Sequence, residues 1–369
     1  MSHPATGDPG TSHPGTLHPV DLVAGVETPI AVDLRFVDVP VRVLTNDAEI
    51  AGRLREYYAP FAGRDESPVA VVRLVQGEVD SAGEWADIER GPGRKVKEAV
   101  RELPPGRLVL KRATGVVMGL WPGHAFAAGD LRANLNQGIN LVNACYAAAM
   151  MARGHLLLHA SAVTWAGRAC ALAGPPGAGK STASLHLVEE GFRFLSNDRV
   201  LARPVAGGVE CCGYPKQPRV NPGTLLHHRR LSALLQPADR AELAAMPAAA
   251  LWDLERKHDV DLETLYGAGT VELGAELTAL VLLKWRRDGQ GLNARRIEAA
   301  EGLANLPLYG KDLGAFDLAR PALAPRTAEQ VVERRARFAD LLGRVRIVEV
   351  TGRPDFPALV DVVADLLRR

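Results

Sequence analysis

The stretch Ala169-Cys-Ala-Leu-Ala-Gly-Pro-Pro-Gly-Ala-Gly-Lys-Ser181 decides which fold the chain can adopt. Residues 174–181 match the pattern G-x-x-x-x-G-K-[ST] at every fixed position. The five apolar residues before this pattern predict a strand, and Leu185 and Leu187 after it predict a helix that ends at Gly191. A strand, a glycine-rich loop and a helix in this order predict a loop that binds phosphate groups, rather than a chance turn beside a surface lysine.

The residue types in this loop follow from the chemistry of phosphate binding. Gly177 and Gly179 allow the backbone to direct successive N–H groups into one concavity, and the helix that follows adds its positive end. We expect Lys180 to neutralise the β- and γ-phosphates of ATP and the Ser181 hydroxyl to ligate Mg²⁺. The predicted nucleotide-binding residues are Gly174, Pro175, Pro176, Gly177, Ala178, Gly179, Lys180, Ser181 and Thr182.

A second short apolar segment follows the helix and ends in Asn197-Asp198. Ligands of α/β sheets bind beyond the carboxyl ends of the strands, so Asp198 is predicted to face the γ-phosphate as a metal ligand or a base. The alternative interpretation is that Asn197-Asp198 forms a turn or caps a helix.

Length and composition limit the remaining possibilities. A chain of 369 residues favours two domains, and 47% hydrophobic with 24% charged residues is typical of a globular protein. Lys plus Arg number 44 and Asp plus Glu 43, so no global charge attracts nucleic acid or an anionic membrane. Four cysteines in so long a chain do not form a disulfide framework. With no transmembrane run and no signal sequence evident, we expect a cytoplasmic protein.

The chain divides by composition into three parts. Residues 1–27 are rich in Pro, Gly, Ser, Thr and His and are predicted to form a disordered tail, whose His3, His13 and His18 are too loosely spaced to favour a metal site. Residues 28–150 predict an α+β domain of unknown role. Residues 151–369 predict an α/β catalytic domain with C-terminal helices.

Local patterns predict the main elements of the second and third parts. Alternating residues predict strands over 31–44, 69–75, 108–110 and 115–120, with a helix capped near Asp47 and a long helix from Leu131 to Ala152. Two apolar runs around Ala166-Gly167 predict a β-hairpin that spans 155–165 and 168–173. We interpret His155, at the start of this hairpin, as a structural residue.

The segment around the phosphate-loop pattern resembles a known family. A hairpin that contains a histidine, then the phosphate-loop pattern, then a helix ending in glycine and a strand closing on an acidic pair resemble the catalytic domain of HPr kinase/phosphorylase, and more closely the HPr-kinase-related kinases. The resemblance covers about residues 154–223 and extends weakly towards residue 320. It implies a P-loop kinase-like fold of the HPr kinase type, preceded by the smaller α+β domain.

The resemblance also implies roles for particular residues. His159 falls at the position of the family's histidine before the loop, and Lys180 and Ser181 fall at its lysine and serine. Its metal-binding glutamate falls on Glu210 if a gap is allowed. Two departures place the chain among the related kinases and argue against HPr itself as the substrate: Asn197 replaces the first residue of the usual Asp-Asp pair, and Thr182 stands where the protein kinases carry Glu.

Because Asn197 is not an acid, the residue that takes the proton of the acceptor hydroxyl is left unassigned. Either Asp198 is both metal ligand and base, or His159 takes the proton, or the chemistry has changed. Without the resemblance, a histidine on an apolar strand is more often a hydrogen-bonded core residue. The proline-rich segment 213–223 presents Lys216 and Arg219, which either clamp a phosphate or an anionic acceptor or are simply solvated.

These observations predict transfer of the ATP γ-phosphoryl group, with Mg²⁺, to a hydroxyl of a protein, a peptide or a small metabolite. The His-Arg-Asp and Asp-Phe-Gly motifs of eukaryotic-type protein kinases are absent from the sequence, as is the guanine-reading Asn-Lys-x-Asp motif. The alternative is a regulatory nucleotide switch or slow ATPase without a dedicated acceptor. The balanced charge disfavours nucleic acid and membrane partners, and self-association into a homo-oligomer is left open.

Overall fold

The computed structural model describes residues 19–89, 91, 93–254, 256–286 and 289–368. Contacts within the chain divide it into two compact units. Unit 1 comprises the chain up to Leu34, Pro40–Cys145 and Gly314–Ala324, and unit 2 comprises Arg35–Val39, Tyr146–Leu313 and Pro325–Arg369. The expected tail residues 1–18, including His3, His13 and His18, lie outside the described part.

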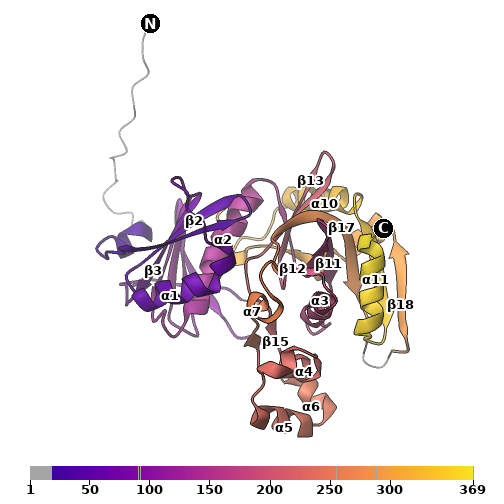
Figure 1. Cartoon of the computed structure of the whole chain (residues 1–369). Coiled ribbons are helices and arrows are strands. Elements are labelled where there is room, and N and C mark those ends of the chain that lie inside the picture. Colours follow the sequence, from indigo (N-terminus) through magenta and orange to yellow (C-terminus); the bar gives the residue numbers. More distant parts are fainter. Residues whose placement is uncertain (1–18, 90, 92, 255, 287–288, 369) are drawn as a thin grey trace. The chain divides into compact units, whose positions relative to one another are not determined.

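Unit 1 is built on a sheet of eight described strands (Figure 1). Their order across the sheet is β1-β2-β3-β8-β7-β6-β5-β4, in which β2, β3 and β8 are parallel and β5 to β8 form an antiparallel meander. The strands are β1 (Ile30–Phe36), β2 (Val39–Thr45), β3 (Ala70–Gln76), β4 (Ala86–Asp87), β5 (Glu98–Leu103), β6 (Gly106–Lys111), β7 (Val117–Trp121) and β8 (His124–Gly129).

Two α-helices accompany this sheet. The carboxylate of Asp47 accepts a hydrogen bond of 2.9 Å from the Ile50 amide, so Asp47 caps α1 (Ala48–Tyr57) as predicted. A short 3₁₀ turn, η2 (Ala59–Phe61), follows. The long helix α2 (Leu135–Ala152) begins four residues later than predicted. Gly138 lets α2 approach β3, because a Cβ there would lie 2.9 Å from the Leu74 side chain.

The segment after residue 18 corrects the prediction of a tail that reaches residue 27. Residues Pro19–Val23 form a 3₁₀ helix, η1, and Val23 is fully buried in the core of unit 1 together with Leu108 and Phe126. The overall composition of residues 1–27 hides this short apolar group, in which Pro19 and Val23 are four residues apart. Apolar burial outweighs the ordering cost for this part of the segment.

Unit 2 mixes helices with a sheet of ten described strands. The main path is β12-β10-β11-β17-β14-β13-β9-β19, and β20 joins β17 with β18 beyond it. The strands are β9 (Leu156–Leu158), β10 (Ala160–Trp165), β11 (Arg168–Ala173), β12 (Arg193–Ser196), β13 (Val200–Val205), β14 (Gly208–Gly213), β17 (Gly274–Leu283), β18 (Leu292–Ile297), β19 (Gly310–Lys311) and β20 (Arg346–Gly352), with β15 (Arg219–Val220) and β16 (His258–Asp259) paired separately.

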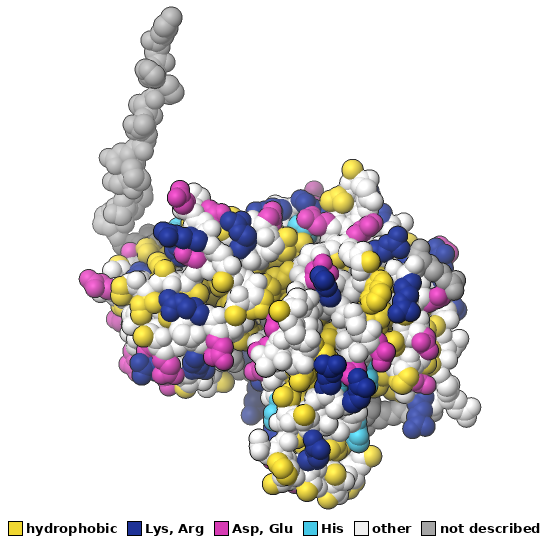
Figure 2. Space-filling model, in the orientation of Figure 1, with side chains coloured by type: hydrophobic (Ala, Val, Ile, Leu, Met, Phe, Trp, Pro, Cys, Tyr) yellow, Lys and Arg dark blue, Asp and Glu magenta, His cyan; other side chains and the backbone are white. Residues whose placement is uncertain are grey.

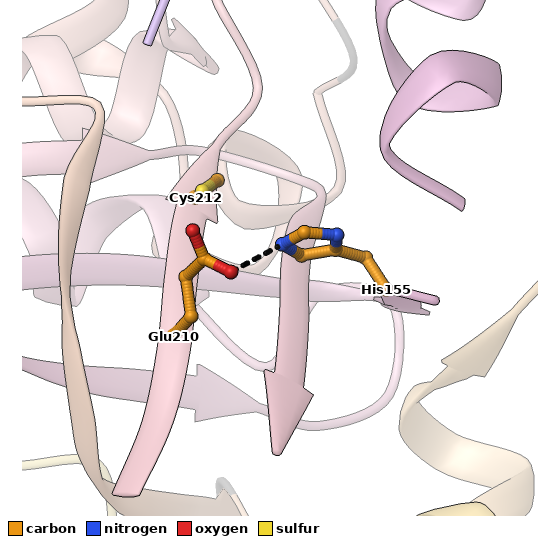
Figure 3. A group of neighbouring side chains, drawn as sticks. All are labelled: His155, Glu210 and Cys212. Atoms are coloured by element: carbon orange, nitrogen blue, oxygen red, sulfur yellow. Dashed lines mark ion pairs between the residues drawn. The ribbon is translucent and has the colours of Figure 1, made fainter. Parts of the chain in front are cut away.

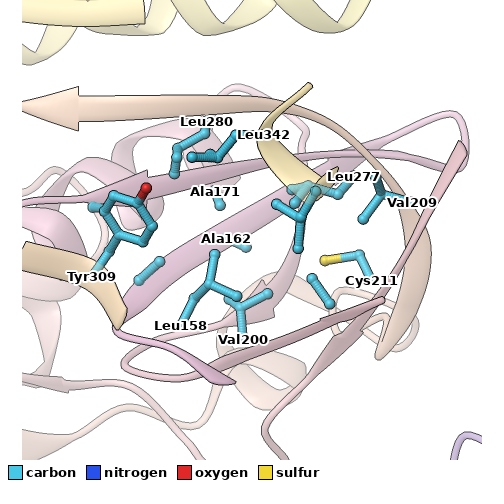
Figure 4. Close-up of a cluster of buried hydrophobic side chains, with 14 of the residues drawn as sticks. Leu158, Ala162, Ala171, Val200, Val209, Cys211, Leu277, Leu280, Tyr309 and Leu342 are labelled. Carbon is cyan, nitrogen blue, oxygen red and sulfur yellow. The ribbon is translucent and has the colours of Figure 1, made fainter. Parts of the chain in front are cut away.

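Helices cover both faces of this sheet. On one face, α3 (Lys180–Glu189) and α11 (Phe356–Arg368) pack against the strand side chains that point to that face, such as Leu172. On the other face, α10 (Ala328–Leu342) packs over a cluster that includes Ala171, Leu280 and Tyr309 (Figure 4). The alternation of Cys170 and Leu172 with Ala169, Ala171 and Ala173 places β11 between the two clusters.

The remaining helices of unit 2 are short. Three of them surround an apolar cluster centred on Leu225, Leu243 and Leu251. In chain order the elements are α4 (Pro222–His227), η3 (Leu231–Leu234), α5 (Pro237–Ala245), α6 (Ala248–Asp253), α7 (Leu262–Tyr266), α8 (Ala299–Ala304) and α9 (Leu306–Tyr309); η4 (Gly314–Phe316) belongs to unit 1. None of the described helices is long and apolar enough to span a bilayer.

The predicted hairpin around residue 166 is present, but its first strand begins at Ala160 and not at His155. β10 and β11 pair antiparallel from Trp165↔Arg168 to Ala160↔Ala173. Leu156–Leu158 form a separate strand, β9, which pairs with β13 and β19 instead. His159 therefore lies between two strands, and its backbone N–H donates a hydrogen bond of 2.6 Å to the Tyr309 carbonyl.

The burial of Val23 generates a stability prediction. We expect Val23→Ala to lower the free energy of unfolding by about 1–3 kcal/mol, because it removes two methyl groups from a filled core. Urea denaturation of the full chain measures this change. Val69→Ala is the control, since Val69 is 41% exposed and its loss should change stability by less than about 0.5 kcal/mol. Equal, small effects at both positions would contradict the packing of residues 19–23.

Candidate functional site

The glycine loop, residues 174–179, connects the end of β11 to the start of α3. Gly177 and Gly179 have positive φ angles of 78° and 76°, the left-handed conformation that favours glycine. The ammonium of Lys180 donates hydrogen bonds of 2.8 Å to the Gly174 carbonyl and 3.1 Å to the Pro175 carbonyl. These two hydrogen bonds hold the ammonium against the first two residues of the loop.

Two aromatic residues far along the chain support the glycine loop. The Trp285 indole N–H donates a hydrogen bond of 2.8 Å to the Ala178 carbonyl. Phe356 lies edge-on to Trp285 and so close to Gly179 that a Cβ there would be 3.1 Å from its ring. Sequence reasoning missed both residues, because nothing local connects positions 285 and 356 with the loop.

Strand register brings Asp198 to the same edge of the sheet as the glycine loop. β10 is antiparallel to both β11 and β12, so these two strands run in the same direction. Ala162 pairs with Ala171 on one side and with Ser196 on the other. Asp198, two residues beyond Ser196, is therefore level with the start of the loop.

His159 and Asp198 meet at this edge. The Nε2 atom of His159 lies 3.2 Å from Oδ1 of Asp198. Burial, the largest single influence, would raise the pKa of the Asp198 carboxyl, but the hydrogen bond and charge of His159 together with the charges of Arg199 and Lys216 lower the pKa to about 2. Asp198 is therefore ionised at any physiological pH.

Lys180 belongs to the same electrostatic group. Burial lowers the pKa of its ammonium, while the carboxylate of Asp198 opposes that change. Burial likewise lowers the pKa of Lys216, again against the attraction of Asp198. The loop-end group, defined as His159, Lys180, Asp198 and Lys216, therefore combines one carboxylate with two amines and an imidazole.

The other predicted site residues have less uniform surroundings. The Thr182 hydroxyl is 2.8 Å from the Thr224 hydroxyl, which connects α3 with α4. Ser181 lies on the first turn of α3. Asn197 has a buried Oδ1 to which no residue in the described ranges donates a hydrogen bond. Arg219 pairs with Asp259 at 2.9 Å, so of the two residues predicted to clamp an anion only Lys216 interacts with Asp198.

Glu210 does not lie with the loop-end group. Strand β13 begins at Val200, two residues after Asp198. Three residues further along this strand lies Arg203, which pairs with Glu210. The three residues of strand from Val200 to Arg203 span about 10 Å and lead away from Asp198. Among the described residues, Glu210 contacts His155 and forms an ion pair with Arg203, so the prediction that it shares a metal with Ser181 and Asp198 gains no support from its contacts.

Glu210 instead lies beside His155. The Nε2 atom of His155 is 3.3 Å from Oε2 of Glu210, and Arg203 donates hydrogen bonds of 2.6 and 3.0 Å to the same oxygen. Burial lowers the pKa of His155. The two histidines of this region thus occupy opposite ends of β9, His155 with Glu210 and His159 with Asp198.

Comparison with known proteins gives little further information. No family model matches the chain, and no curated protein matches it. Among solved structures, the HPr(Ser) kinase/phosphatase from Coxiella burnetii is 12% identical, with coverage of 57% of this chain and 93% of that chain and a TM-score of 0.28. A likeness of this size carries no argument about activity.

The contact between His159 and Asp198 generates a titration prediction. His159→Gln should raise the pKa of the Asp198 carboxyl above about 2, because glutamine cannot supply the imidazolium charge. Carboxyl ¹³C NMR of the labelled chain measures this shift. His155→Gln is the control and should leave the Asp198 resonance unchanged.

The same contact has a consequence for stability. A carboxyl whose folded pKa lies below its ordinary value stabilises the fold above that ordinary value, and this contribution is lost as pH falls towards about 2. The free energy of unfolding should therefore decrease less in His159→Gln than in the wild type between roughly pH 4 and pH 2. These limits are the ordinary pKa of an aspartate carboxyl and the lowered pKa of Asp198. An unchanged Asp198 titration in His159→Gln would contradict the contact.

Proposed function

We propose that unit 2 binds ATP with Mg²⁺ at the glycine loop and transfers the γ-phosphoryl group to a hydroxyl acceptor. The observation that carries the proposal is the register of β10, β11 and β12, which puts Asp198 and His159 beside the loop that holds Lys180. A phosphate loop alone supports nucleotide binding. A carboxylate and an imidazole at the same edge supply the groups that transfer to a hydroxyl requires.

The residues at this edge fit a magnesium nucleotide. Lys180 and the amides of the glycine loop would neutralise the phosphate oxygens, and α3 would add its positive end. Ser181 and Asp198 would hold Mg²⁺, which supplies charge neutralisation between the β- and γ-phosphates. The low pKa of Asp198 suits a metal ligand, because the carboxylate need not lose a proton to bind.

The same low pKa argues that Asp198 is not the base. A carboxylate with a pKa of about 2 is a poor proton acceptor at neutral pH, where a base works best near the working pH. In the neutral ring His159 would donate from Nε2 to Asp198 and keep a lone pair on Nδ1 to accept the proton. We therefore assign the proton to His159 and the orientation of its ring to Asp198.

The proposed step transfers the γ-phosphoryl group directly from ATP to the acceptor hydroxyl. The acceptor oxygen forms a bond to the γ-phosphorus while the bond from that phosphorus to the oxygen bridging to the β-phosphate breaks. The hydroxyl proton passes to Nδ1 of His159, and ADP leaves with the electron pair of the broken bond. Lys216 would stabilise an anionic acceptor or the transferred group, since it already interacts with Asp198.

A nucleotide switch is the second candidate function. It is favoured by Asn197, whose amide cannot take a proton and whose buried Oδ1 receives no hydrogen bond from the described residues. With one carboxylate, the site could bind nucleotide and hydrolyse it slowly. Incubation with γ-labelled ATP and fractionated lysate separates the candidates: labelled acceptor supports transfer, whereas slow release of free phosphate alone supports the switch.

Binding of nucleotide should depend on Lys180. Lys180→Ala should weaken the affinity for Mg²⁺·ATP by ~10–150-fold, because a charge-assisted contact to phosphate contributes ~1.5–3 kcal/mol. Isothermal titration calorimetry measures this loss. Lys97→Ala, at an exposed lysine of unit 1, should bind as the wild type does. Equal affinity of Lys180→Ala and the wild type would remove the glycine loop from the proposed site.

The assignment of the proton predicts different behaviour for two variants. His159→Gln should reduce transfer by ~10²–10⁴-fold and abolish the fall in rate at acid pH, since no imidazole remains to be protonated. Asp198→Asn should mainly raise the Mg²⁺ concentration needed for half-maximal rate. Rates against pH and against Mg²⁺ concentration distinguish these outcomes. Near-normal transfer in both variants would leave nucleotide binding as the only surviving part of the proposal.

A further inference from the structure

The second cluster of chemically active side chains in unit 2 is formed by His155, Glu210 and Cys212, the His155 cluster (Figure 3). Glu210 and Cys212 are two residues apart on β14, so both side chains project from the same face of the strand. Cys211 points to the other face, into the apolar core. His155 reaches the group from the residue before β9, and the ligand atoms of all three residues lie within 4.8 Å of one another.

The tautomer of His155 leaves a lone pair directed into the cluster. Its Nδ1 is 2.9 Å from the Met150 carbonyl oxygen, which can only accept, so Nδ1 carries the proton. In the neutral ring Nε2 is then an acceptor. It is buried, has no hydrogen-bond partner among the described residues, and faces the carboxylate of Glu210 at 3.3 Å. A carbonyl that fixes Nδ1–H and frees Nε2 is the arrangement found behind metal-binding histidines.

The side chain of His155 is almost completely buried, with 1% exposed. A buried nitrogen that faces a carboxylate oxygen without a proton between them is costly unless a positive group lies nearby. Arg203 supplies part of that charge, but it contacts Oε2 of Glu210. No hydrogen bond joins Oε1 of Glu210 to a described residue, and Glu210 is 36% exposed, so an ion could reach this group from solvent.

We propose that His155, Glu210 and Cys212 bind a divalent transition-metal ion of the zinc class. Imidazole nitrogen, thiolate sulfur and one carboxylate oxygen are ligands of Zn²⁺ and Co²⁺, whereas Mg²⁺ prefers oxygen alone. Tetrahedral coordination at normal bond lengths separates ligand atoms by about 3.3–3.8 Å, so small side-chain rotations would close the group. A fourth position would remain for water.

Binding is coupled to the loss of one proton. The Cys212 thiol becomes a thiolate when its sulfur bonds to the metal, and the proton goes to solvent. The ion would join β14 to the start of β9, which are otherwise connected through β13. This site is separate from the loop-end group and does not depend on the proposed phosphoryl transfer.

Cobalt titration of the full chain, freed of metal and reduced, tests the proposal. We expect one Co²⁺ per chain with sulfur-to-cobalt charge-transfer absorption in the near ultraviolet. This absorption, which arises from thiolate sulfur, distinguishes the His155 cluster from the histidines of residues 1–18, a segment that contains no cysteine. Cys212→Ser should abolish it, and His155→Gln should weaken the affinity by at least ~10-fold. Zn²⁺ should raise the midpoint of thermal unfolding of the wild type and leave that of Cys212→Ser unchanged.

Cys211→Ala is the matched control, because Cys211 neighbours Cys212 but faces the core. It should keep the cobalt spectrum. Absence of the sulfur band from the reduced wild type, or an identical band in Cys212→Ser, would overturn the proposal. Circular dichroism of each variant without metal shows whether it has folded.

Arg203 provides a variant that should gain affinity. Arg203 competes with a cation for Glu210, so Arg203→Gln should bind Co²⁺ more tightly than the wild type. Weaker binding in a folded Arg203→Gln chain would contradict the assignment of Glu210 as a ligand. This result keeps the proposal testable even if Cys212→Ser fails to fold.

Discussion

The antiparallel pairing of β10 with both β11 and β12 is the constraint on which the loop-end group depends. A strand that is antiparallel to two neighbours forces those neighbours to run in the same direction. The chain leaves β11 into the glycine loop and leaves β12 into Asp198, so both exits fall on one edge of the sheet. A shift of one residue in β12 would turn its side chains to the other face and move Asp198 along that edge.

The short strand β9 separates two groups of chemically active side chains, the His155 cluster and the loop-end group. Its four-residue span from His155 to His159 covers about 13 Å of extended chain. One histidine faces Asp198 beside the glycine loop, and the other faces Glu210 and Cys212. Charged residues of both signs are otherwise interspersed on the face of the molecule in Figure 2, in agreement with a net charge of +1. Local placement of charge, and not a global field, therefore distinguishes the two groups.

Local patterns in the sequence predicted the elements around the site, because they depend on neighbouring residues. The strand before residue 174 and the helix after it are examples, as is, in unit 1, the cap at Asp47. Contacts between distant positions could not be predicted in the same way. Trp285 and Phe356 reach the glycine loop only through the packing of β17 and α11, and the pairing of β13 with β14 decides which residues lie beside Glu210. Val23 was missed because composition was averaged over a segment of which only part packs.

The central claim is that bound nucleotide lies next to His159 and not next to His155. Chromium(III)·ATP, a paramagnetic nucleotide that does not exchange its metal, tests this claim through the NMR signals of the labelled histidines. Paramagnetic broadening falls steeply with distance, so the account predicts that His159 broadens strongly when chromium(III)·ATP binds, while His155 remains sharp. Binding of the nucleotide without broadening of His159, or with broadening of His155 alone, would contradict it.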